Sequence, residues 1–96
     1  MKNGRRVVIT GMGALTPVGT SVQETWYNLC EGRSGLGRIP RFDASAVPTQ
    51  IAGEVKGFEA QRYMDRKVAR RSDLFAQYAI AVTRMALDDA QQLVRR

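Results

Sequence analysis

The segment VVITGMGALTPVG, residues 7–19, constrains the fold of this chain more than any other part of the sequence. Its β-branched start predicts a strand over residues 6–10, and nearly continuous apolar character is typical of a strand covered on both faces. The glycine-rich turn that follows resembles a phosphate-binding loop, which needs G-x-G-x-x-G at the start of a helix. Gly11 and Gly13 have this spacing, but Thr16 replaces the third glycine, and the proline after it prevents a helix from beginning there. We therefore expect a tight structural crossover rather than a nucleotide site.

Apolar periodicity predicts two helices. The first covers residues 21–31, with Ser21 as the N-cap, Glu24 completing a capping box, and Gly32 as the natural stop. The second covers residues 72–94, and its many alanines leave it slim enough to lie close to a sheet or another helix. A strand, a glycine turn and a helix form the opening half of a βαβ unit, so we expect an α/β fold.

The long helix predicts an incomplete domain. A helix with so many apolar residues needs cover on more than one side, whereas the rest of the chain offers one short helix and two short strands, over residues 6–10 and 51–55. We therefore expect residues 1–96 to be the N-terminal part of a larger fold. Apolar area left uncovered in such a piece predicts self-association.

Composition narrows the possible functions. The 96 residues carry a formal net charge of +6, which favours an acidic partner. No apolar run approaches the ~20 residues of a membrane span, and we expect a cytoplasmic protein without a membrane partner. The chain has no histidine, which removes the commonest general base and metal ligand, so no catalytic, metal or cofactor residue is predicted. Cys30 is the only cysteine, and its place in the first helix beside Leu29 predicts a buried, inert thiol.

Basic residues cluster before the long helix. Five of them lie between Arg62 and Arg71, against a single acid, Asp65. If residues 65–71 are helical, Lys67, Arg70 and Arg71 share one face and form a docking site for an anionic partner; the alternative is a solvated charged turn. Nucleic acid is the weaker reading, because only one aromatic residue lies nearby and no nucleic-acid-binding signature is present.

Taken in order, the motifs resemble the N-terminal portion of the bacterial beta-ketoacyl-acyl carrier protein synthases of type II, the elongating condensing enzymes of fatty acid synthesis. The resemblance covers residues 4–90. It rests on the glycine turn, the helix with Trp26, and the motifs RSG (33–35), RFDAS (41–45), IAGEV (51–55) and DRKVARRSDLFAQYAI (65–80). Polyketide ketosynthases share the glycine turn and RFD, and they remain the alternative.

The resemblance implies a thiolase-like fold of layered helices and sheets (αβαβα) in a homodimeric enzyme several times longer than this chain. Such enzymes perform a decarboxylative Claisen condensation, using a cysteine nucleophile and two histidines on substrates carried by the phosphopantetheine of acyl carrier protein. Those residues lie beyond this chain, and Cys30 does not match the nucleophile, so we expect the isolated chain to be inactive. The family docks its acidic carrier on basic positions that Lys67, Arg70 and Arg71 match. A stand-alone module that docks such a carrier is a further alternative.

Overall fold

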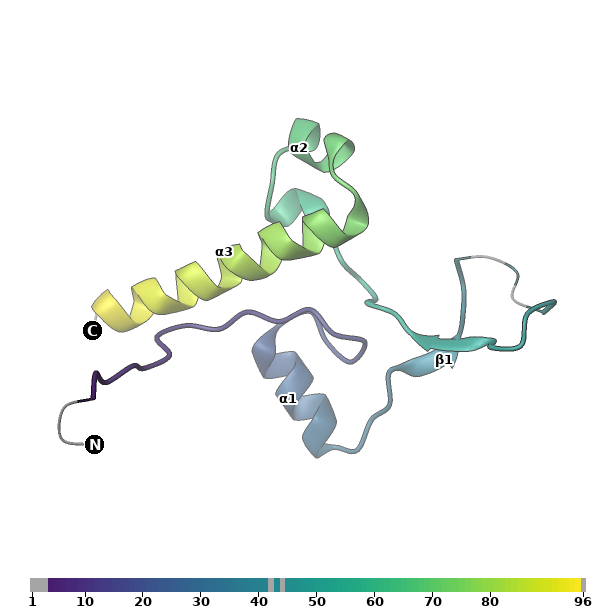
Figure 1. The fold of residues 1–96 in the computed structure, drawn as a ribbon, viewed down its shortest axis with the longest axis horizontal. Helices are drawn as coiled ribbons and strands as arrows, with labels where there is room; N and C mark the ends of the chain where they lie inside the picture. The colour runs from purple at the N-terminus through teal and green to yellow at the C-terminus, as the bar shows by residue number, and fades with distance from the viewer. Residues whose placement is uncertain (1–3, 42, 44, 96) are drawn as a thin grey trace.

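The computed structural model of the protein describes residues 4–41, 43 and 45–95. Its elements, in chain order, are α1 (Val22–Cys30), β1 (Leu36–Arg38), β2 (Ile51–Gly53), the 3-10 turn η1 (Ala60–Arg62), α2 (Arg66–Arg71) and α3 (Leu74–Arg95). The chain before α1 runs beside α3, and the β1–β2 hairpin extends away from the helices (Figure 1). Among the described residues, no helix has the length and apolar character needed to cross a membrane.

Local signals account for both ends of α1. Its N-cap, Ser21, accepts a hydrogen bond at 3.0 Å from the Glu24 N–H, while the Glu24 carboxylate accepts one at 2.8 Å from the Thr20 N–H. This reciprocal pairing is a capping box shifted by one residue. At the other end Gly32 adopts a φ of +73°, and the N–H groups of Gly32 and Arg33 bond back to the carbonyls of Leu29 and Asn28. The helix therefore ends in a Schellman motif, one residue short of the predicted boundary.

The turn before α1 is fixed by hydroxyl and amide groups. Thr16 and Gly19 exchange backbone hydrogen bonds of 2.8 and 3.2 Å, and the Thr16 hydroxyl lies 2.9 Å from that of Thr25 on α1. The Asn28 side chain donates to the Val18 carbonyl from the same helix. Thr16, which stands where a dinucleotide loop has its third glycine, therefore serves to hold the turn against the helix.

The only sheet among the described residues is the hairpin. β1 and β2 pair antiparallel, with Leu36 opposite Gly53 and Arg38 opposite Ile51. The Lys56 ammonium group ties the base of the hairpin to the preceding turn by donating to three backbone carbonyls, those of Pro17 (3.4 Å), Gly35 (3.1 Å) and Glu54 (3.2 Å).

The predicted strand over residues 6–10 is not formed. That segment has no secondary structure and makes no backbone hydrogen bond to any other described residue. Its apolar side chains face solvent: Val7 is 89% exposed, Val8 72% and Ile9 79%. A strand exists only with a neighbour to hydrogen-bond to, and the described part of the chain places none beside this segment.

The glycine turn packs directly on α3. A Cβ built on Gly13 would lie 2.8 Å from the Met85 Cβ and closer still to the Val82 carbonyl oxygen, and one built on Gly11 would lie 2.6 Å from the Ala90 nitrogen. Both approaches are tighter than any side chain permits, so the two glycines are needed for the segment to lie against the helix. The alanines of α3 were expected to let another segment approach closely. Gly11 makes such an approach at Ala90.

The molecule has almost no core. Ala81 is the single fully buried apolar residue among those described, and the accessible surface is 8103 Å². A compact protein of this length exposes about 5,500 Å². The radius of gyration, 17.2 Å, likewise exceeds the roughly 12.5 Å expected of a globular domain.

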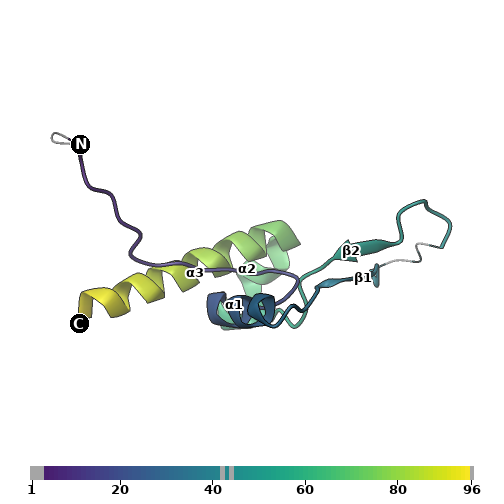
Figure 2. The same ribbon diagram turned by 90° about the horizontal axis from the view of Figure 1, so that it is seen from below.

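The prediction of a buried Cys30 thiol is wrong. Cys30 is exposed, and so are Trp26 (67%) and Leu29 (55%), which share its side of α1. No described segment covers the face of α1 that carries these three side chains. Figure 2 shows α1 lying apart from the hairpin, beneath α3 and the segment that precedes it.

We predict that Gly13→Ala destabilises the chain by about 1–3 kcal/mol, because the added methyl group must displace the α3 backbone. Gly37→Ala is the matched control: Gly37 lies on an exposed strand, and a Cβ there would meet nothing within 4 Å. The measurement is the free energy of unfolding in urea. The loss of helix α3 is the signal, recorded by far-ultraviolet circular dichroism. Equal stability of the two variants would contradict the packing role of Gly13.

Candidate functional site

The basic cluster stands on a short helix, α2, whose start is set by a local cap. Asp65 is the N-cap, and its carboxylate accepts a hydrogen bond at 3.0 Å from the Val68 N–H. The predicted basic face required residues 65–71 to be helical. The structure meets this requirement, since α2 follows directly after its N-cap, Asp65. Arg70 and Arg71 fall in its last turn, where positive charge is favoured by the helix dipole.

Two further contacts fix α2 relative to α3. The Gln77 side chain, on the first turns of α3, donates to the Ala69 carbonyl at 2.8 Å and to the Ser72 carbonyl at 3.3 Å. These carbonyls belong to the end of α2, so a single amide closes the helix and ties it to its neighbour. The orientation of α2 thus depends on hydrogen bonds that span only eight residues of sequence.

An aromatic group supports the turn that leads into α2. Phe58 stacks on Tyr63 with ring centroids 6.0 Å apart and meets Tyr78 of α3 edge-on at 5.0 Å. Tyr63, the one aromatic residue next to the basic run, is therefore half-buried against another ring instead of standing free to stack on a base. This arrangement argues against a nucleic-acid site.

Lys67, Arg70 and Arg71 are all exposed on α2. None of the three forms an ion pair within the part of the chain that the structure describes, where the one ion pair joins Arg41 and Glu54. Three unneutralised cations on six residues of capped helix form a local positive field. We call these three residues the α2 basic cluster. Such a cluster can attract and orient an acidic surface without any catalytic chemistry.

The loop that contains RFDAS is anchored by a network that the sequence did not predict. Arg41 pairs with Glu54, just after β2, and its guanidinium also lies 3.5 Å from the Tyr78 hydroxyl on α3. These partners lie 13 and 37 residues away, beyond the reach of any local pattern. Asp43 instead accepts from the Ser45 N–H at 3.0 Å, and this hydrogen bond lowers the pKa of the Asp43 carboxyl.

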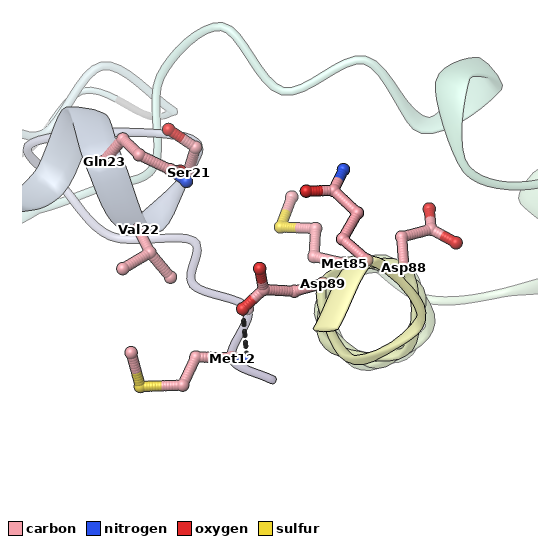
Figure 3. A pocket seen from close by; sticks show the side chains of 9 residues that line it. Met12, Ser21, Val22, Gln23, Met85, Asp88 and Asp89 are labelled. Carbon is pink, nitrogen blue, oxygen red and sulfur yellow. Dashed lines mark hydrogen bonds between the residues drawn. The ribbon is translucent and has the colours of Figure 1, made fainter. Parts of the chain in front are cut away.

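A pocket of about 250 Å³ lies between the glycine turn, the start of α1 and α3. Figure 3 shows Asp89 pointing toward Met12, whose N–H donates to the Asp89 carboxylate at 3.1 Å, while Asp88 points away. The carboxylate thus occupies the side of the turn where a phosphate loop would offer its N–H groups to an anion. No group of three metal-binding side chains occurs among the described residues.

Comparison with known proteins identifies the family to which this chain belongs. Residues 4–95 match the beta-ketoacyl synthase family in its N-terminal domain. Among solved structures, the ishigamide ketosynthase/chain length factor superposes with a TM-score of 0.74 at 40% identity, covering 91% of this chain and 22% of that one. The chain therefore belongs to the beta-ketoacyl synthase family, and the predicted thiolase-like α/β fold is confirmed.

Individual relatives indicate which type of synthase within the family this chain resembles. The chain is 46% identical to the 3-oxoacyl-[acyl-carrier-protein] synthase 2 of Synechocystis sp. over 94% of its length, and 52% identical to that of Vibrio harveyi over 90%. Its match to the synthase 2 of Staphylococcus aureus is 47% identical over 95% of the chain. The resemblance to the type II synthases is thus confirmed. The chain spans about one fifth of the length of these relatives.

We predict that Asp89→Ala speeds hydrogen exchange at the Met12 amide by roughly fivefold, which corresponds to the loss of about 1 kcal/mol for one hydrogen bond. Asp89→Asn should restore most of the protection, since its carboxamide oxygen can still accept. Asp88→Ala is the control, because Asp88 has the same charge one residue away and makes no hydrogen bond to the turn. Amide exchange measured by NMR would distinguish them, and equal effects of Ala at both positions would contradict the anchoring role of Asp89.

Proposed function

We propose that this chain is the N-terminal part of a 3-oxoacyl-[acyl-carrier-protein] synthase that elongates fatty acids. The identity of 46–52% to curated synthases of this type supports it, as does the family match over residues 4–95. The proposed reaction is a decarboxylative Claisen condensation between an enzyme-bound acyl thioester and a malonyl group on acyl carrier protein. The proposed parent enzyme is a cytoplasmic homodimer.

The chain itself supplies none of the reacting groups. A condensation of this kind needs a thiolate nucleophile and donors for the developing oxyanion. The sequence contains no histidine, and its single thiol, Cys30, is exposed at the end of α1, whereas the resemblance implies a nucleophile on a turn between a strand and a helix. The role proposed for these residues is therefore recognition.

The observation that carries this role is the α2 basic cluster. Lys67, Arg70 and Arg71 are exposed, unpaired by any described acid, and held on a helix that is capped at both ends. An acidic carrier protein matches this surface in charge, and a fixed cationic helix limits the entropy lost when the two proteins dock. The proposed partner is thus acyl carrier protein, docked at α2.

A ketosynthase of the polyketide type is the second candidate. It is supported by the 40% identity to the ishigamide ketosynthase/chain length factor. The higher identity to the synthase 2 relatives favours fatty acid elongation. Docking of the carrier at α2 is expected in either pathway, so the test of docking does not depend on which pathway applies.

We predict that the double variant Lys67→Glu/Arg70→Glu binds acyl carrier protein about tenfold more weakly or worse, since two attractive charges become repulsive. The control is Arg38→Glu/Arg84→Glu, which changes the net charge equally but alters exposed arginines on β1 and α3. Affinity measured by isothermal titration between low and high salt should fall with salt for the wild type and the control. Equal losses in both double variants would show that net charge acts rather than α2.

We predict that the purified 96-residue chain does not condense acyl and malonyl thioesters, because it holds neither histidine nor a placed nucleophile. The measurement is release of carbon dioxide from malonyl-carrier in the presence of an acyl-carrier, with a full-length synthase as the positive control. Release at a rate near that of the full-length enzyme would refute the assignment of the catalytic groups to residues outside this chain.

A further inference from the structure

Helix α2 is too short to be stable without support from its ends. It has 6 residues and buries none of its side chains. Helices shorter than about 12 residues are marginal in water unless packing or caps stabilise them. Asp65 caps the start of α2. The contacts at its other end therefore decide whether the last turn, which carries Arg70 and Arg71, is ordered.

The end of α2 has no closing residue of its own. α1 is followed by a glycine with positive φ, whereas α2 ends at Ser72, whose backbone is extended with φ −108° and ψ 134°. The backbone hydrogen bond at this end, from the Ser72 N–H to the Ala69 carbonyl, is long at 3.4 Å. The Gln77 amide donates to the same carbonyl at 2.8 Å and also to the Ser72 carbonyl. The shorter hydrogen bond at the end of α2 thus comes from a side chain of α3.

We propose that Gln77 is a positioning residue for carrier docking, and that it keeps Arg70 and Arg71 ordered before the carrier binds. A residue that is already ordered loses less conformational entropy on binding, so a closed last turn strengthens docking without any contact between Gln77 and the carrier. Lys67 lies in the first turn, next to the Asp65 cap, so its order does not depend on Gln77. This inference rests on the proposed docking at α2 and adds the residue that makes that site rigid.

The order of the last turn can be measured in the free chain. Gln77→Met keeps the length of the side chain and removes its N–H donors. Gln91→Met is the matched control, because Gln91 is exposed near the other end of α3. We expect the NMR order parameters of the Arg70 and Arg71 amides to fall from about 0.85 to below about 0.6 in Gln77→Met alone, with the Lys67 amide unchanged. Unchanged order at Arg70 and Arg71 would overturn the inference.

Binding kinetics measure the consequence for docking. Gln77→Met leaves the net charge unchanged, so the association rate and its salt dependence should match those of the wild type. Dissociation of acyl carrier protein should be about fivefold faster, as expected for the loss of one hydrogen bond. Partial unfolding would instead lower the fraction of active chain and leave the dissociation rate unchanged. Stopped-flow measurements separate these two cases, and an unchanged dissociation rate would contradict the role of Gln77 in docking.

A double-mutant cycle identifies the cations that depend on Gln77. Arg71→Gln should weaken docking less in a Gln77→Met background than in the wild-type chain, because the disordered turn has already weakened the contact that Arg71 makes. Lys67→Gln removes the same charge and should weaken docking equally in both backgrounds. Equal coupling of Gln77 to the two cations would indicate a general change in the chain and would overturn the proposed closure of the last turn.

Further variants separate the possible failures. If Gln77→Met loses the circular dichroism of α3, Gln77→Glu takes its place, because its carboxylate has a similar shape and can only accept hydrogen bonds. Gln91→Glu then supplies the matched charge. Docking that survives Lys67→Glu/Arg70→Glu would refute the proposed site itself. Docking that is lost in that double variant but unaffected by the Gln77 variants would refute only the role of Gln77.

Discussion

The contact of the N-terminal turn with α3 is the constraint on which the rest of the structure depends. Gly11 and Gly13 bring the backbone of the turn to the helix surface at Ala86, Ala90 and Val82, and Asp89 accepts a hydrogen bond from the residue between the glycines. This contact fixes the direction in which the chain enters α1. The N–H group of Met12, which a phosphate loop would offer to an anion, donates instead to the Asp89 carboxylate.

Energetically, the chain is a set of well-formed local elements with few contacts between them. Caps, short side-chain networks and one ion pair define α1, α2 and the hairpin, but Ala81 is the only buried hydrophobic residue among those described. Hydrophobic burial is the dominant favourable term in folding, so a chain that leaves Val7, Trp26 and Phe75 exposed lacks most of that term. The family relation explains the pattern, because the relatives are roughly four times as long as this chain and can supply the missing cover.

How much could be predicted from the sequence follows from the range of each interaction. Ser21 and Gly32 act on residues three or four positions away, and their predicted roles as N-cap and helix stop are confirmed. The Asp65 cap was not predicted, although it acts over the same short range. The α2 basic cluster could be predicted for the same reason. The strand at residues 6–10 and the burial of Cys30 depend on distant segments, and both predictions are wrong. The link from Arg41 to Glu54 and Tyr78 has no local signal at all.

The difference between short-range and long-range contacts also matters for function. The docking surface proposed at α2 is built from contacts within residues 58–78, and the aromatic rings and Gln77 that support it belong to the same stretch. It therefore does not require the sheet that the rest of the fold would need. Catalysis in this family requires groups brought together from distant parts of a complete domain, whereas recognition of an acidic surface requires only a few cations at fixed spacing. The docking proposed at α2 thus depends on a short stretch of the chain, whereas catalysis depends on a complete domain.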